Sequence, residues 1–176
     1  IMQWSDHYRR YARYNAWINQ SLLDASLSLS KEDQDKDQQV FFHSLTGSWN
    51  HIIVGDLLWL NRLAVIFPII NDSIDRWPKP SQLEQILYPN LAELVPARQQ
   101  LDKLIIQWCD VLRENDHEGR LQYNNRQDEP QVLPLPDVLQ HMFNHQTHHR
   151  GQITALLSQQ GIDYGTTDFI SMPGDD

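Results

Sequence analysis

Residues 141–152 hold four of the eight histidines of the chain and read His141-Met142-Phe143-Asn144-His145-Gln146-Thr147-His148-His149-Arg150-Gly151-Gln152. Successive residues of an α-helix are turned by about 100°. His145 and His149 therefore lie about 40° apart, one turn along the same face of a predicted helix. Two imidazoles placed in this way can bind the same metal ion.

The surroundings of this pair on the helical wheel are apolar. Within about 80° of His145 on one side lie Val138, Leu156, Met142 and Ile153. A buried imidazole without a partner costs roughly 1–3 kcal/mol, and a metal ion would supply the missing partner. His141 and His148 lie about 40° and 60° to the other side of His145, where they are expected to line a cleft or to support the ligands.

Length and composition limit the possible classes of protein. The 176 residues fit one domain, residues 1–176, and 14 Lys and Arg against 23 Asp and Glu give a formal charge of −9. This acidic balance argues against binding to nucleic acid or to an anionic membrane surface. Cys109 is the only cysteine and no long apolar run or signal-peptide pattern is present, so a cytoplasmic location is expected.

Apolar periodicity predicts an all-α fold, a four-helix bundle. The expected helices cover about residues 4–27, 38–67, 81–113 and 136–160, with the third kinked or interrupted at Pro89 and Pro96. The proline-rich segment 68–80 is expected to be a long loop, which would allow a crossover between the second and third helices. Residues 31–37 are expected to be a polar connector, 117–133 a short hairpin or irregular loop, and 162–176 a loop-like tail. Asn15 lies on the apolar stripe of the first helix, where we expect a hydrogen bond between helices.

His51 is the predicted third ligand, because it lies near the apolar face of the second helix between Gly47 and Gly55. The two glycines have two compatible interpretations: close packing between helices, or an open cleft above the histidine for water or substrate. Together, His51, His145 and His149 would form a three-histidine site with an open coordination position, which is typical of catalytic metal centres. Zn²⁺ is the expected ion and Ni²⁺ the alternative. His7, His43 and His117 are expected to be solvated.

The motif Asn144-His145-Gln146-Thr147-His148-His149-Arg150-Gly151-Gln152 resembles the signature of the DinB-like family of damage-inducible, metal-dependent proteins, which is related to the YfiT-like proteins. Asn50-His51-Ile52 with Asp56 and Trp59 is similar to the second helix of that family, and Tyr14-Asn15-Ala16-Trp17 to its first. The resemblance implies an up-down-down-up bundle that is often a homodimer, with His51, His145 and His149 as ligands of a divalent metal. It also implies that His148 is not a ligand and that Arg150 and Gln152 have supporting roles.

Three functional readings follow from these residues. In the first, the protein is a metal-dependent enzyme that acts on a small molecule by thiol transfer or hydrolysis. A low-molecular-weight thiol is then a possible co-substrate, and His148 and His141 are the candidate catalytic residues. In the second, it is a non-catalytic, metal-binding, stress-associated dimer. In the third, the histidines only form hydrogen bonds with one another.

Overall fold

The structure is a computed structural model and describes residues 1–174. It is mostly helical, with one small sheet. Its four long helices are α1 (Trp4–Leu27), α3 (Leu45–Leu63), α5 (Leu91–Asp110) and α6 (Leu135–Gln159). Shorter helices are α2 (Lys31–Asp35) and α4 (Pro68–Ile74), and single 3₁₀ turns cover Glu114–Glu118 and Phe169–Ser171. None of the helices in the described part of the chain is both long and apolar enough to span a membrane.

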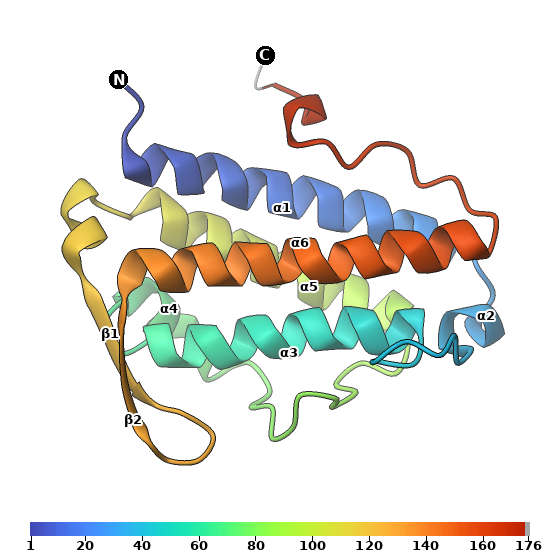
Figure 1. The fold of residues 1–176 in the computed structure, drawn as a ribbon, viewed down its shortest axis with the longest axis horizontal. Coiled ribbons are helices and arrows are strands. Elements are labelled where there is room, and N and C mark those ends of the chain that lie inside the picture. Colours follow the sequence, from blue (N-terminus) through green and yellow to red (C-terminus); the bar gives the residue numbers. More distant parts are fainter. Residues whose placement is uncertain (175–176) are drawn as a thin grey trace.

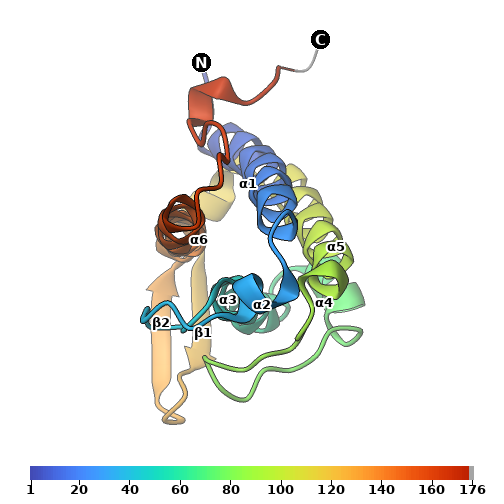
Figure 2. The same ribbon diagram turned by 90° about the vertical axis from the view of Figure 1, so that its right-hand side faces the viewer.

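The long helices pack side by side as a bundle. In Figure 1, α1 and α6 run in one direction and α3 and α5 run in the other. The view along the bundle in Figure 2 places α3 diagonally opposite α1, and α5 diagonally opposite α6. The side chains between them form one continuous core, in which Trp49, Trp108 and Phe143 are fully buried. The prediction of a helical bundle agrees with this arrangement.

A two-stranded hairpin precedes α6. Strands β1 (Arg120–Asn124) and β2 (Pro130–Pro134) are antiparallel and pair Leu121 with Leu133. The hairpin lies beside the end of α3 and the start of α6 (Figures 1 and 2). The sequence analysis predicted a hairpin or loop in this region, and the hairpin is the form observed.

The second long helix is shorter than predicted. We expected it over residues 38–67, but α3 begins at Leu45, where the Ser44 side chain accepts a hydrogen bond from the backbone N–H of Gly47 at 3.0 Å. Positive φ angles at Gln39 and His43 hold the preceding residues in a non-helical loop. This loop brings Phe42 against α3 while Phe41 is exposed.

Two segments predicted as connectors contain short helices instead. Residues 31–35 form α2, capped by Ser30, whose side chain accepts from the backbone N–H of Asp33. Pro68 occupies the first turn of α4, a position where its missing N–H costs no hydrogen bond. After α4, residues 75–90 follow an irregular path along the outside of the bundle to the start of α5 (Figure 1).

The third long helix begins ten residues later than predicted, at Leu91 rather than Ser81. Asn50 holds the irregular segment in place, because its side chain accepts from the backbone N–H of Tyr88 and donates to the Tyr88 carbonyl. Pro96 lies inside α5 without ending it. One proline removes a single backbone hydrogen bond, and the packing of α5 along α1 keeps the helix continuous.

The tail after α6 lies over α1. The Tyr14 hydroxyl donates to the carbonyl of Thr167 at 2.5 Å, and Phe169 packs on Tyr11 and Tyr14. The predicted loop-like character therefore holds for residues 162–174, apart from one 3₁₀ turn. The last two residues of that prediction lie outside the described part of the chain.

Candidate metal centre

The structure brings the three predicted ligand residues together. His51 comes from α3, and His145 and His149 come from successive turns of α6. Their ligand nitrogens all lie within 4.8 Å of one another, and the Nε2 atoms of His51 and His145 are 3.0 Å apart. His51 and His149 are buried, and His145 is partly buried. This three-histidine group could hold a metal ion.

Neighbouring oxygens fix the orientation of two of the rings. His51 Nδ1 lies 3.0 Å from the Leu83 carbonyl oxygen, and His149 Nδ1 lies 2.8 Å from Gln152 Oε1. Because a carbonyl oxygen can only accept, both Nδ1 atoms carry hydrogen and donate. The lone pair of each neutral ring is then on Nε2, which is the atom available to a metal.

The local environment keeps the three imidazoles neutral. Burial lowers the pKa of His145 to about 3, with a further lowering by the neighbouring His149 and His51. Burial also lowers the pKa of His149 to about 4, against the opposing hydrogen bond to Gln152, and it lowers the pKa of His51. Neutral imidazole is the form that binds metals, so at pH 7 no proton has to be removed from an imidazolium.

The spacing of the rings fits a single ion. Two nitrogens bound tetrahedrally to one Zn²⁺ at 2.0–2.1 Å are about 3.3 Å apart, only slightly more than the 3.0 Å between His51 Nε2 and His145 Nε2. With His51 Nδ1 protonated, the hydrogen between these two atoms belongs to His145 Nε2. An ion would take the place of that hydrogen.

The glycines beside His51 are explained by close packing. A Cβ atom at Gly55 would lie 2.6 Å from His145 Cε1, so the absence of a side chain makes room for that ring. A Cβ atom at Gly47 would lie 2.0 Å from the carbonyl oxygen of Phe42, so Gly47 admits the backbone of the loop before α3. The open cleft expected together with this packing is not found at either glycine, because the His145 ring fills one space and the loop fills the other.

Phe42 forms a wall of the site that the sequence analysis missed. Its ring stacks on His51 with centroids 3.7 Å apart and an interplanar angle of 16°, and it meets His149 edge-on at 5.5 Å. Periodicity placed Phe42 inside a helix, and only its separation from the helix by the Ser44 cap could have indicated another role. The stacking shields one side of the ligand set from water.

The two candidate catalytic histidines lie next to the group without belonging to it. His141 is exposed, with its ring 6.0 Å from that of His145 and 5.2 Å from that of Trp59. Burial of part of its ring and the nearby Arg62 lower the pKa of His141. His148 is exposed, with its ring 4.8 Å from His149. The other three histidines, His7, His43 and His117, are exposed, as predicted.

A network of buried polar side chains lies beneath the histidines. Arg98 on α5 pairs with Asp56 of α3 and with Asp102, both at 2.7 Å. Gln146, which follows the ligand His145, donates to both carboxylate oxygens of Asp56 at 3.0 and 3.1 Å. Burial raises the pKa of Asp56 to about 6, so this carboxylate is still ionised at neutral pH.

The same network continues to α1 through Arg150. Its guanidinium donates to the side-chain oxygens of Asn15, Asn19 and Gln146. The prediction that Asn15 forms a hydrogen bond between helices is confirmed, because its partner Arg150 is on α6. All four long helices therefore contribute side chains to one polar network. Because it joins α6 to α3, this network helps to position His145 and His149 relative to His51.

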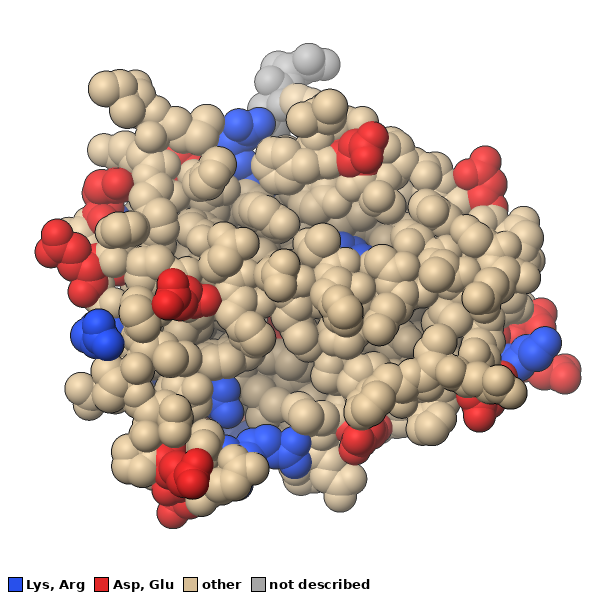
Figure 3. All heavy atoms as spheres, viewed as in Figure 1, with Lys and Arg blue, Asp and Glu red and all other residues tan. Residues whose placement is uncertain are grey.

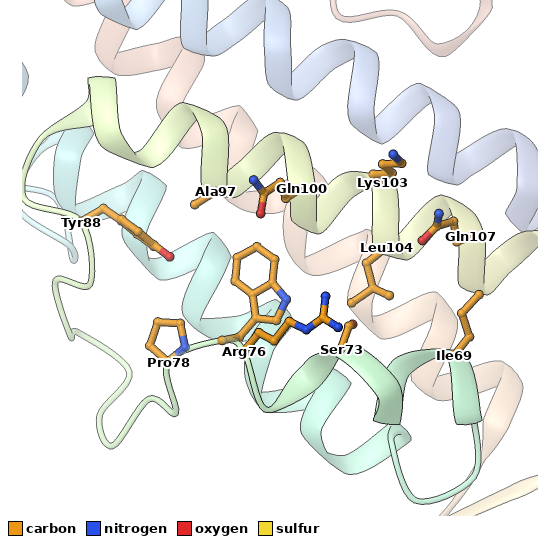
Figure 4. Close-up of a pocket in the computed structure, with 11 residues that line it drawn as sticks. Ile69, Ser73, Arg76, Pro78, Tyr88, Ala97, Gln100, Lys103, Leu104 and Gln107 are labelled. Carbon is orange, nitrogen blue, oxygen red and sulfur yellow. The ribbon is translucent and has the colours of Figure 1, made fainter.

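A separate hollow of about 450 Å³ lies between α4, α5 and the segment 75–90. Figure 4 shows Arg76 and Pro78 on one side of it and α5 side chains, including Gln100 and Lys103, on the other, and Trp77 also lines it. None of the three clustered histidines lines this hollow. It is distinct from the candidate metal centre.

Comparisons with known proteins agree with this geometry. The sequence model of the DinB family matches residues 2–174. Protein DinB of Bacillus subtilis (strain 168) is 26% identical over 167 residues, an alignment that covers 94% of this chain and 92% of that protein. The search of solved structures gave no match.

Proposed function

The chain belongs to the DinB family, and we propose that it is a divalent-metal protein in which His51, His145 and His149 hold one ion for chemistry on a small molecule. The observation that carries this proposal is the convergence of three neutral imidazoles within 4.8 Å, two of them already oriented through Nδ1. Three protein ligands leave a coordination position open, as in catalytic zinc sites. The helix directions in Figure 1 support the up-down-down-up topology as part of the proposal.

Zn²⁺ is the proposed ion and Ni²⁺ the alternative, since imidazole donors suit both. When bound, such an ion supplies Lewis acidity and lowers the pKa of a coordinated water toward about 7, and it acts on a small thiol in the same sense. The proposed reaction is therefore transfer of a low-molecular-weight thiol to an electrophile, or hydrolysis of a small substrate.

The side chains around the site have separate tasks in this proposal. Leu83 and Gln152 keep the Nε2 atoms of His51 and His149 directed at one point, while Phe42 excludes water from one side. His141 is the better placed candidate to accept a proton from a substrate. It is exposed next to His145, and its lowered pKa keeps a ring nitrogen free at neutral pH. His148 is the second candidate.

One observation favours the alternative of a non-catalytic metal protein. Phe42 covers His51 so closely that the site is partly closed on the side of the loop. In this alternative the metal stabilises a stress-associated homodimer and nothing is turned over. Homodimerisation is common to both versions of the proposal.

The test is elemental analysis of protein purified without a histidine tag and after reconstitution with Zn²⁺ or Ni²⁺. We expect about one ion per chain in the parent protein and in the matched controls His141→Ala and His148→Ala, with loss of the ion in His51→Ala and His145→Ala. A metal-free parent after reconstitution would refute the proposal. Turnover of small thiols with electrophilic acceptors, lost in His145→Ala, separates the enzyme from the non-catalytic alternative.

A further inference from the structure

Arg62, in the last turn of α3, contacts two aromatic rings near the candidate metal centre. Its guanidinium carbon lies 4.5 Å from the centroid of the Trp59 ring and 4.3 Å from that of Tyr123 on β1. The two rings meet edge to face at 5.5 Å. Ring centroids this close together cannot cover opposite faces of one guanidinium, and aromatic contacts do not use up the five N–H donors of an arginine.

No carboxylate of the described residues forms an ion pair with this cation. Among residues 1–174, Arg62 forms neither an ion pair nor a side-chain hydrogen bond with another residue, although it is only partly exposed. The two fully buried arginines, Arg98 and Arg150, both have several oxygen partners. In a chain with 23 acidic residues and a charge of −9, a partly buried arginine without an acidic partner is available to bind an external anion.

The position of Arg62 connects it to the histidines. The Trp59 ring that carries the guanidinium lies 5.2 Å from His141, and the His141 ring lies 6.0 Å from the ligand His145. Figure 3 shows that the middle of this face of the molecule, over α3 and α6, is mainly uncharged, with acidic side chains toward its margins. A small anion between Arg62 and the histidines would therefore lie against a mainly uncharged part of the surface.

We propose that Arg62, held against Trp59 and Tyr123, binds a carboxylate of the small molecule that reacts at the histidine centre. Guanidinium is suited to this task because its paired N–H groups match the two carboxylate oxygens. The inference rests on the proposed function and adds to it a substrate class: a small acid, or a thiol bearing an acid group. The competing explanation is that Arg62 only fastens the hairpin to the end of α3.

The test uses three probes that differ in one feature each. Glutathione is a tripeptide-sized thiol, about 10 Å long when extended, that carries two carboxylates. Glutathione diethyl ester keeps the thiol but masks both carboxylates, and S-methylglutathione keeps both carboxylates but masks the thiol. Binding of each probe to the zinc-reconstituted protein is measured by calorimetry, with zinc content determined in parallel.

We expect glutathione to bind about tenfold or more tightly than its diethyl ester, as is typical of a charge-assisted hydrogen bond. Arg62→Gln should abolish this preference without changing binding of the ester, and Arg62→Lys should keep part of it. Arg126→Gln is the matched control, because Arg126 is exposed on the same hairpin and should leave all affinities unchanged. The melting temperature of each variant shows whether the hairpin is still docked.

The outcomes separate this inference from the proposed function. Equal binding of the acid and the ester, or equal weakening of both by Arg62→Gln, would overturn the carboxylate site and leave Arg62 as a structural clamp. Binding of S-methylglutathione that depends on Arg62 in a protein that takes up no zinc would support the carboxylate site while the metal proposal fails. If neither glutathione nor S-methylglutathione binds, the inference is wrong.

Discussion

Replacing Gly55 with alanine is the sharpest test of how the fold builds the histidine centre. The added Cβ would lie 2.6 Å from His145 Cε1, and ordinary contact begins at 3.4 Å, so the imidazole must move by about 0.8 Å. Distances in a metal site tolerate errors of only about 0.2 Å. We therefore expect Gly55→Ala to weaken Zn²⁺ binding at least as much as loss of a supporting residue does, about 10- to 100-fold.

The same substitution should lower the stability of the metal-free protein by no more than about 2.5 kcal/mol. Alanine in place of glycine inside a helix is worth roughly 0.5–1 kcal/mol, which offsets part of the roughly 1–3 kcal/mol cost of overpacking. Gly151→Ala is the matched control, because it also lies in a long helix of the site and its Cβ would meet nothing within 4 Å. It should stabilise the protein by about 0.5–1 kcal/mol with unchanged metal affinity.

The assay is competition for Zn²⁺ against a chelator of known affinity, with urea unfolding of both metal-free variants. If Gly55→Ala binds Zn²⁺ as tightly as the parent protein and Gly151→Ala do, the His145 ring is not held close to Gly55, and the prediction is refuted. If Gly55→Ala is instead largely unfolded, the His145 ring cannot shift to make room for the methyl group. Gly55 is then required for folding itself and not only for the position of His145.

Three further predictions concern the surroundings of the site. Gln152→Ala removes the acceptor for His149 Nδ1 and should weaken Zn²⁺ binding about 10- to 100-fold with little change in melting temperature; equal affinity would contradict the orienting role of Gln152. The metal-free protein should lose stability as the pH falls from about 6.5 to about 4. Burial depresses the pKa of His149 to about 4, so there the unfolded chain takes up protons that the folded chain does not, at up to about 1.4 kcal/mol per pH unit. Urea midpoints across this range measure the effect, and an unchanged slope in His149→Gln would refute its assignment to this residue. Arg98→Met leaves Asp56 and Asp102 buried without their shared cation and should cost about 3–5 kcal/mol in urea unfolding at pH 7; a loss below 1 kcal/mol would show that the pairing is weak.

The helices were predictable to the extent that their caps and periodicity agree. The strong apolar period of α1 and α6 placed their ends within about one residue of those observed. The start of α3 was misplaced because Phe41 and Phe42 continue an apolar pattern, while the positive φ at His43 leaves no periodic signal. The start of α5 was misplaced because the segment before it is held by tertiary hydrogen bonds to Asn50.

In the candidate site, too, the features set by helical periodicity were predictable and those set by tertiary contacts were not. The spacing of His145 and His149 was sufficient to pair them, because helical geometry is fixed. The support that His51 receives from Leu83 is a backbone carbonyl, which carries no residue signature. The contact of Arg62 with Tyr123 depends on the position of the hairpin, because Tyr123 reaches Trp59 only after β1 has packed beside α3.

The buried network of Asp56, Arg98, Asp102 and Arg150 also bears on the order in which the chain assembles. Its charged groups come from α3, α5 and α6, and α1 adds amide partners, so every charge is satisfied only when all four long helices are in place. A bundle of two or three helices would bury ions without their full set of partners, at several kcal/mol per ion. The four long helices should therefore assemble in a single cooperative step. The same step brings His51, His145 and His149 together. The proposed metal ion would then bind to histidines that folding has already brought together, and would not be needed to nucleate folding.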